Sequence, residues 1–386
     1  MVSYPARMVP HSGFRRKYPF GWCYRGPSRD EQNRIIVVPL DVHADTVPAV
    51  GGGDALTVLD GSAFAISDRR GDIRGGVHGF VHADRRHLSR FVVSIDGRPM
   101  APIASATPAP NEAIVVHRLR DVSANEASAI VVRRRTIGGG LREHLELWAT
   151  GAHLVSVRIT VDVSADFAHI FDVKAGRSGP AAQSRADSEG VCLIAPRVDA
   201  QTRVRWDRAP DTIDGESMTW ELVAQPHARS SIVLLVEPLA DGATAAGVDV
   251  RDPHASPVAI RDLDRWKQER PGVTSTDARL VLGVEQAFAD LAALQIRDVA
   301  HPERVLVAAG APWFMTLFGR DALLTTWMTL PFDASLAAGV LLTLGELRGR
   351  RYEPMSEEEP GKILHEVRHG SDGGPFSQRG RYYGSI

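Results

Sequence analysis

The hydrophobic pattern of this chain changes its period near Pro271, and this change limits the possible folds most strongly. Upstream, short β-branched runs are separated by Gly, Pro and Asp turns, and between Val155 and Val161 apolar residues alternate with polar ones, as in a half-buried strand. Downstream, apolar residues recur at helical spacing. Many strands without intervening helices are typical of a sandwich, so we predict a β-domain followed by a helical domain.

The individual elements follow from these two patterns. Strands are expected at 35–39, 91–95, 129–133, 154–161 and 231–236. Consecutive helices are expected at 280–294, 321–330 and 335–347. Thr274, Ser275 or Thr276 can cap the first helix, and Pro331 ends the second. In the third helix, the residues expected to face inward are Leu336, Val340, Leu341, Leu344 and Leu347.

The chain has 386 residues and 44% apolar content, enough for two domains with two cores. We assign residues 35–265 to the β-domain and residues 266–386 to the helical domain. Residues 1–34 are rich in Lys and Arg and lack the apolar core of a signal peptide. They are predicted to be a disordered basic tail.

Charge and cysteine content argue against several classes of function. The 45 Lys+Arg residues nearly balance 47 Asp+Glu residues, so no global field favours nucleic acid as a partner. Cys23 and Cys192 are far apart and lack metal-type spacing, so neither a disulfide scaffold nor a thiolate zinc site is expected. A reducing, cytoplasmic setting fits best. No apolar run approaches the ~18–20 residues that a membrane span needs, so no membrane partner is expected.

The segment from Trp313 to Asp321 (WFMTLFGRD) carries the candidate chemistry. It places two aromatic residues on an entry loop, then Gly319, then the adjacent charges Arg320 and Asp321 where a helix begins. Sugar sites use an aromatic face against the apolar side of a pyranose and charged groups that bind hydroxyls strongly. The alternative is that Asp321 caps the helix, Arg320 is its surface partner and the aromatics are core residues.

Three ordered signatures favour the first of these interpretations. They are Trp313 to Asp321, Glu357 to Glu366 (EEEPGKILHE) and Gly380 to Ser385 (GRYYGS). Their order and spacing resemble those of the bacterial and archaeal glycogen-debranching, amylo-α-1,6-glucosidase-like family. The upstream half is similar to the β-rich domain of that family at residues 61–68, 71–72, 84–89 and 166–171, so the resemblance extends from about Leu56 to the C-terminus.

The resemblance implies an N-terminal β-supersandwich followed by the first helices of an (α/α)6 toroid, whose mouth holds the active site. It implies that Arg320 and Asp321 bind hydroxyls of a terminal glucose and that Trp313 lines the pocket. The implied activity is hydrolysis of α-1,6-glucosidic branches in glycogen-like glucans, without a metal or another cofactor. Trehalose or another glucoside is an alternative substrate, because a fold by itself does not choose one.

The same resemblance places Lys362, His365 and Glu366 at the rim of the pocket. The alternative is an ion-pair cluster that ties a loop to a helix, because such networks also gather charges. A second cluster, from Asp84 to His87 (DRRH), is expected to form a charged turn at a strand end, although it could reach toward the toroid mouth.

His365 to His369 (HEVRH) also matches the H-E-x-x-H pattern of zinc proteases, which needs a helix. Gly370 follows immediately, and no later residue is a Glu or His that could serve as a third ligand. The match also lies inside the debranching-type signature. We therefore predict no metal site.

Glycoside hydrolysis ordinarily requires a general acid and a second carboxylate. By the resemblance, these catalytic residues are expected beyond Ile386, and the region from Pro271 onward has room for only about four helices. The toroid is therefore expected to be truncated, and this chain is expected to bind glucan without turnover. An apolar helical layer left open would favour aggregation or a downstream polypeptide that completes the toroid. The alternative function is a non-catalytic carbohydrate-binding or interaction subunit completed by a partner chain.

Overall fold

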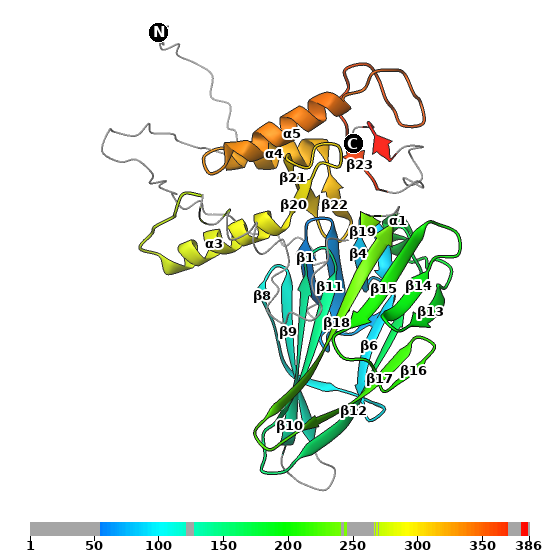
Figure 1. Ribbon diagram of the computed structural model, residues 1–386. Helices are drawn as coiled ribbons and strands as arrows, with labels where there is room; N and C mark the ends of the chain where they lie inside the picture. The colour runs from blue at the N-terminus through cyan, green and yellow to red at the C-terminus, as the bar shows by residue number, and fades with distance from the viewer. Residues whose placement is uncertain are drawn as a thin grey trace.

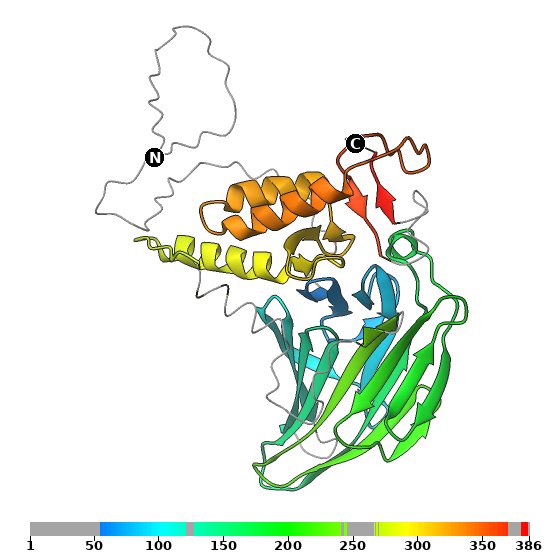
Figure 2. The ribbon, with the colours of Figure 1, turned by 45° about the horizontal axis from the view of Figure 1, so that its top comes forward.

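The computed structural model describes residues 55–120, 127–240, 243–244, 266, 268, 270–369 and 380–384. The predicted tail at 1–34 and the predicted strand at 35–39 lie outside these ranges. Within them, a large β-sandwich lies below a layer of helices, with small sheets between the two (Figures 1 and 2). The predicted order of a β-rich part followed by a helix-containing part is therefore observed.

Two antiparallel sheets form the sandwich. The larger has the strand order β13 (Gln183–Asp187), β14 (Gly190–Ile194), β15 (Ala200–Trp206), β18 (Arg229–Ala240), β11 (Leu141–Ala149), β10 (Ala127–Ile137), β9 (Glu112–Arg120) and β8 (Ala101–Ala109), with β19 (Ala243–Thr244) on β18. The smaller has the order β16 (Thr212–Asp214), β17 (Ser217–Ala224), β12 (Val155–Ser164), β6 (Arg90–Ile95) and β3 (Ile73–Arg74), with β7 (Arg98–Pro99) on β6.

The alternation read from the sequence produces this sandwich. In β12, Val157, Ile159 and Val161 are buried while Arg158 is exposed. In β11, every second residue from Leu141 to Ala149 is buried. Because side chains of a strand point alternately to its two faces, one face of each sheet enters a shared core. The strand predictions at 91–95, 129–133, 154–161 and 231–236 are confirmed by β6, β10, β12 and β18.

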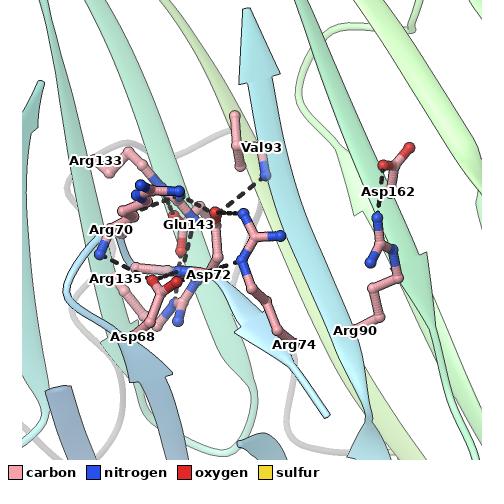
Figure 3. Close-up of polar contacts among 11 residues, drawn as sticks. Asp68, Arg70, Asp72, Arg74, Arg90, Val93, Arg133, Arg135, Glu143 and Asp162 are labelled. Atoms are coloured by element: carbon pink, nitrogen blue, oxygen red, sulfur yellow. Dashed lines mark hydrogen bonds and ion pairs between the residues drawn. The ribbon is translucent and has the colours of Figure 1, made fainter. Parts of the chain in front are cut away.

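A buried ion-pair cluster fastens the turn after β2 (Ala63–Asp68) to the inner face of the larger sheet (Figure 3). Arg133 donates from Nη1 to Asp72 Oδ1 at 2.6 Å and from Nε to Glu143 Oε1 at 2.8 Å. Arg135 donates to the other Glu143 oxygen at 2.7 Å. Charges this deeply buried are tolerated only when paired, so each partner depends on the others.

A third sheet, with the order β1 (Ala55–Asp60), β2, β4 (Gly79–His82) and β5 (Arg85–Leu88), lies between the sandwich and the helices (Figure 2). The short helix α1 (Ile170–Lys174) lies near it. Phe64, Val81 and Ile170 pack in one core with residues of the C-terminal part, including Leu317 and Val340. The packing therefore continues across the expected boundary at residue 265.

The C-terminal part contains α3 (Ala278–Ala293), α4 (Gly319–Thr329) and α5 (Ala334–Leu347), close to the three predicted ranges. The helices are not consecutive, however, because β20 (Gln295–Arg297), β21 (Val305–Gly310) and β22 (Phe314–Leu317) form a sheet between α3 and α4. The last described strands, β23 (Glu366–Val367) and β24 (Arg381–Tyr382), pair with each other.

Two local predictions about these helices are wrong. Asp277 caps α3 in place of Thr274, Ser275 or Thr276, because its carboxylate accepts the Arg279 N–H at 2.9 Å. Leu341 was expected to face inward but is 60% exposed. It follows Val340 by one residue, about 100° around the helix, and so leaves the face that packs on the core.

The outer faces of α4 and α5 expose several large apolar side chains. These are Leu324, Trp327, Met328 and Leu330 near α4, and Leu341 and Leu342 on α5; we call them the open helical face. Trp327 is 68% exposed. A patch of this kind marks a surface that another element or molecule can cover. Among the described residues, no helix is long and apolar enough to cross a membrane.

Candidate functional site

The candidate site forms where β22 leads into α4. Phe318 occupies the N-cap position of α4 and makes no side-chain cap hydrogen bond. Asp321 lies inside the first turn, so the alternative that it caps the helix is wrong. A carboxylate in the first turn interacts favourably with the positive end of the helix dipole, which explains its place without using its hydrogen-bonding capacity.

Arg320 and Asp321 both retain that capacity. Arg320 is exposed and Asp321 is half-buried, and neither side chain has a hydrogen bond or an ion pair with any residue that the structure describes. The two are thus not surface partners of each other. A guanidinium and a carboxylate that are adjacent, fixed on a helix and unpaired can together donate to and accept from hydroxyl groups.

Aromatic residues precede these charges in the same chain segment. Phe314 is 40% exposed and meets the Phe318 ring edge to face at 5.5 Å. Lys174, at the end of α1, places its ammonium 5.3 Å from the Phe314 ring centre. Trp313 is half-buried and packs against the second core. The strand before α4 therefore offers aromatic surface, and Phe314 is its most accessible part.

A loop from the end of the chain closes against the start of α4. The Gly319 N–H donates to the His365 carbonyl at 2.9 Å, and Phe318 pairs with Glu366 as an isolated bridge. A Cβ atom on Gly319 would lie 2.0 Å from the Leu364 carbonyl oxygen. Only glycine permits this approach of two backbones, which brings the first and second sequence signatures together.

The three rim residues have different surroundings. Lys362 donates from Nζ to the Glu357 carbonyl at 3.0 Å and lies 3.5 Å from a Glu359 carboxylate oxygen. The His365 ring lies edge-on to Phe318 at 5.6 Å. Lys362 and His365 are half-buried and close to the α4 start, and their contact with a ligand remains a prediction.

Glu366 is the most buried of the rim residues, and its carboxylate is already engaged. Arg368 donates to Glu366 Oε2 from Nε at 2.9 Å, and its Nη2 lies 2.7 Å from the same oxygen. This geometry matches the ion-pair alternative more closely than a free ligand group. A role of Glu366 in shaping the pocket therefore requires that it act while paired with Arg368.

The zinc-protease interpretation of His365 to His369 is wrong. The segment is extended and includes β23, so its two histidines do not share one face of a helix. His365 contacts Phe318, whereas His369 contacts Asp84 at the β4–β5 turn. In the ranges described above, no three His, Cys, Asp or Glu side chains are grouped as metal ligands.

The sequence prediction gave no role to Arg368 and treated Asp84 mainly as part of a charged turn at a strand end, with a reach toward the toroid mouth as the alternative. Asp84, which the DRRH cluster contains, accepts from Arg368 Nη1 at 3.0 Å and from the His369 backbone N–H at 2.9 Å. Burial alone would raise the pKa of Asp84. The His369 hydrogen bonds and the Arg368 charge outweigh burial and hold this pKa below its ordinary value.

A cavity of about 390 Å³ adjoins the loop that closes on α4. Its lining includes Arg350, Met355 and Tyr383. The neighbouring Tyr382 ring lies 5.9 Å from His365. The cavity falls in the size range of small-ligand pockets, but none of its lining residues belongs to the candidate site.

Comparison with known proteins assigns the β-domain. The family model described as the N-terminal domain of (some) glycogen debranching enzymes matches residues 58–234. Those residues are similar to this family. The resemblance read from the sequence is thereby confirmed for the part that precedes the helices.

One solved structure supports the fold. A putative kojibiose phosphorylase from the human microbiome is similar with a TM-score of 0.51 and 8% sequence identity over 85% of this chain and 50% of that one. The present chain thus spans about half the length of that protein. A second structure, the Slr1438 protein from Synechocystis, has 11% identity and a TM-score of 0.33 over 50% of this chain and 100% of that one. No curated protein shows a significant match.

Proposed function

We propose that this chain provides the sugar-binding part of a debranching-type glucosidase that hydrolyses α-1,6-glucosidic branches of glycogen-like glucans. The debranching-type family of the β-domain supports the substrate class. The observation that carries the proposal is the unpaired Arg320 and Asp321 at the start of α4, beside exposed aromatic surface. We further propose that the reaction needs no cofactor and occurs in the cytoplasm.

Arg320 and Asp321 divide the recognition of a glucose unit between them. The guanidinium donates to hydroxyl oxygens, and the carboxylate accepts from hydroxyl hydrogens. Phe314 or Trp313 provides a flat apolar surface for the ring face. Because both charged groups sit on one helix turn, their backbone positions are fixed relative to each other before the sugar binds.

The described carboxylates serve binding better than proton transfer. Hydrolysis needs a carboxylic acid that protonates the leaving oxygen and a second carboxylate that activates water or attacks the sugar. The Glu366 carboxylate is engaged by Arg368, so it is committed to that ion pair. We assign Glu366 to shaping the site and Asp321 to hydroxyl binding, and we leave the acid and base to other residues of the complete site.

Binding of a branched limit dextrin by purified protein, measured by titration calorimetry, tests the proposal. Removing a charged hydrogen bond costs about 1.5–3 kcal/mol, so Arg320→Ala or Asp321→Asn is expected to weaken binding about 10- to 100-fold. Arg297→Ala, which removes an exposed charge on β20, serves as a matched control. Equal affinity of all variants, or no binding by the wild type, would contradict the proposal.

A second candidate function has its own support. The open helical face is the kind of surface that a partner chain covers, which favours a non-catalytic carbohydrate-binding or interaction subunit completed by a downstream polypeptide. Trehalose and other glucosides belong in the same titration as competing ligands. Tighter binding of trehalose than of the dextrin would change the substrate assignment but not the site.

A further inference from the structure

Arg368 joins parts of the molecule that are far apart in sequence. Its Nη1 donates to Asp84 Oδ1 and to the Trp313 carbonyl, each at 3.0 Å. Its Nε and Nη2 both engage Glu366 Oε2. One guanidinium therefore holds the strand that precedes α4, the loop that closes on α4, and a turn of the β-domain.

The Arg368 side chain is buried and enclosed by aromatic rings and carboxylates. Its side chain is 2% exposed. The guanidinium lies 4.7 Å from the Phe171 ring centre on one element and 5.2 Å from the Phe318 ring centre on another. A buried arginine needs partners for its charge, and here Asp84 and Glu366 supply two carboxylates. Removal of either carboxylate would leave the other to balance the charge alone.

Asp84 comes from the β4–β5 turn, and its position is tightly set. Ala83 and Asp84 both have positive φ, at 47° and 63°. This is the left-handed region that favours glycine, so the surrounding contacts must hold the turn in place. The Asp84 carbonyl accepts from the Ile170 N–H at 2.8 Å, while its carboxylate faces Arg368 and His369. The turn thus points the buried Asp84 carboxylate toward Arg368 in the C-terminal part.

We propose that Asp84 and Arg368 are positioning residues, through which the β-domain fixes Trp313 and Glu366 in the arrangement that sugar binding requires. This inference rests on the proposed function and deepens it. The β-domain then acts as part of the sugar site without touching the sugar. Glucan binding and the contact between the β-domain and the helical part become linked, so each stabilises the other.

The linkage has a consequence that a purely structural ion pair would lack. Bound glucan should slow hydrogen exchange at the His369 amide, which donates to Asp84. Conversely, loss of the Asp84 charge should weaken glucan binding, although Asp84 itself does not line the sugar site. We expect a reduction in affinity of at least 10-fold.

The test compares Asp84→Asn with Asp72→Asn. Both replace a buried carboxylate that pairs with a buried arginine, but Asp72 pairs with Arg133 in the sandwich and is remote from α4. Affinity for a branched limit dextrin is measured by calorimetry, and exchange at the His369 amide is followed with and without the dextrin. We expect Asp72→Asn to bind with wild-type affinity and Asp84→Asn to lose at least 10-fold in affinity. In the wild type, we expect slower hydrogen exchange at the His369 amide when the dextrin is bound.

The outcomes separate this inference from the function on which it rests. If the wild type binds dextrin and Asp84→Asn binds equally well, the positioning role is overturned and the sugar site stands. If the wild type does not bind, the proposed function fails first. If Asp84→Asn does not fold, Arg368→Lys replaces it, since a lysine keeps the buried charge but cannot make all four contacts; unchanged affinity would again overturn the inference.

Discussion

Replacing Gly319 with alanine should separate the two backbones that build the site. The added Cβ would lie 2.0 Å from the Leu364 carbonyl oxygen, against 3.4–4 Å for an ordinary contact. The loop must therefore move by roughly 1.4 Å, because backbone atoms cannot rotate away as side chains do. The hydrogen bond from the Gly319 N–H to the His365 carbonyl, now 2.9 Å, would lengthen or break.

The magnitude follows from these contacts. Overpacking of a close-packed site costs about 1–3 kcal/mol, and loss of the backbone hydrogen bond adds about 1 kcal/mol. The helical propensity of alanine returns up to about 1 kcal/mol, since Gly319 is the first residue of α4. The net expectation is a destabilisation of about 1–3 kcal/mol and a glucan affinity reduced about 10-fold or more.

Thermal unfolding and dextrin titration of Gly319→Ala provide the measurement, with Gly345→Ala as control. Gly345 lies in α5 with no heavy atom within 4 Å of an added Cβ, so alanine there should stabilise the helix by up to about 1 kcal/mol and leave binding unchanged. The reasoning is refuted if Gly319→Ala matches Gly345→Ala in both stability and affinity.

Three further predictions concern the rest of the molecule. Asp72→Asn should lower the free energy of unfolding by about 3 kcal/mol, because Arg133 stays buried with one carboxylate fewer. Urea denaturation measures this change, and a loss below about 1 kcal/mol would argue against the buried network. His87 and His117 are buried, which lowers their pKa values to about 3 and about 4, below the ~6.5 of an unfolded chain. Unfolding should therefore take up protons, and stability should fall below pH ~6.5 by about 2 kcal/mol per histidine at pH 5, whereas a flat urea-stability profile from pH 7 to 5 would contradict this burial. Trp327→Ser should reduce light scattering of concentrated protein with little change in melting temperature, since the indole is exposed. Increased scattering would argue against self-association through the open helical face.

Local patterns predicted the three long helices and four strands of the sandwich. The alternation around Ile159 and the helical spacing around Leu344 each depend on residues close in sequence, and the corresponding strand and helix were found. The sheet formed by β20 to β22 was missed because β20 and β22 have only three and four residues, and because apolar and polar residues do not alternate in the VLVAAG run of β21. Leu341 was misplaced because an apolar residue on an uncovered helix face has the same local signature as a buried one.

The candidate site was predictable only in part, for a related reason. Arg320 and Asp321 were found because they stand together in one signature. The contact of Arg368 with Asp84 joins residues 284 positions apart, and no spacing rule connects them. The charged turn at Asp84 was noted in the sequence as a strand end. Its contact with Arg368 depends on the fold, which brings the β4–β5 turn against the closing loop, and is seen only in the structure.

Hydrogen exchange of the whole chain, with and without a branched limit dextrin, tests the central claim most directly. The account predicts slower exchange at two places, the start of α4 around Arg320 and the closing loop from Lys362 to His369. Protection confined to the sandwich sheets would move sugar binding to the β-domain and support the non-catalytic alternative. Protection nowhere, at dextrin concentrations that saturate binding, would contradict the proposed site altogether.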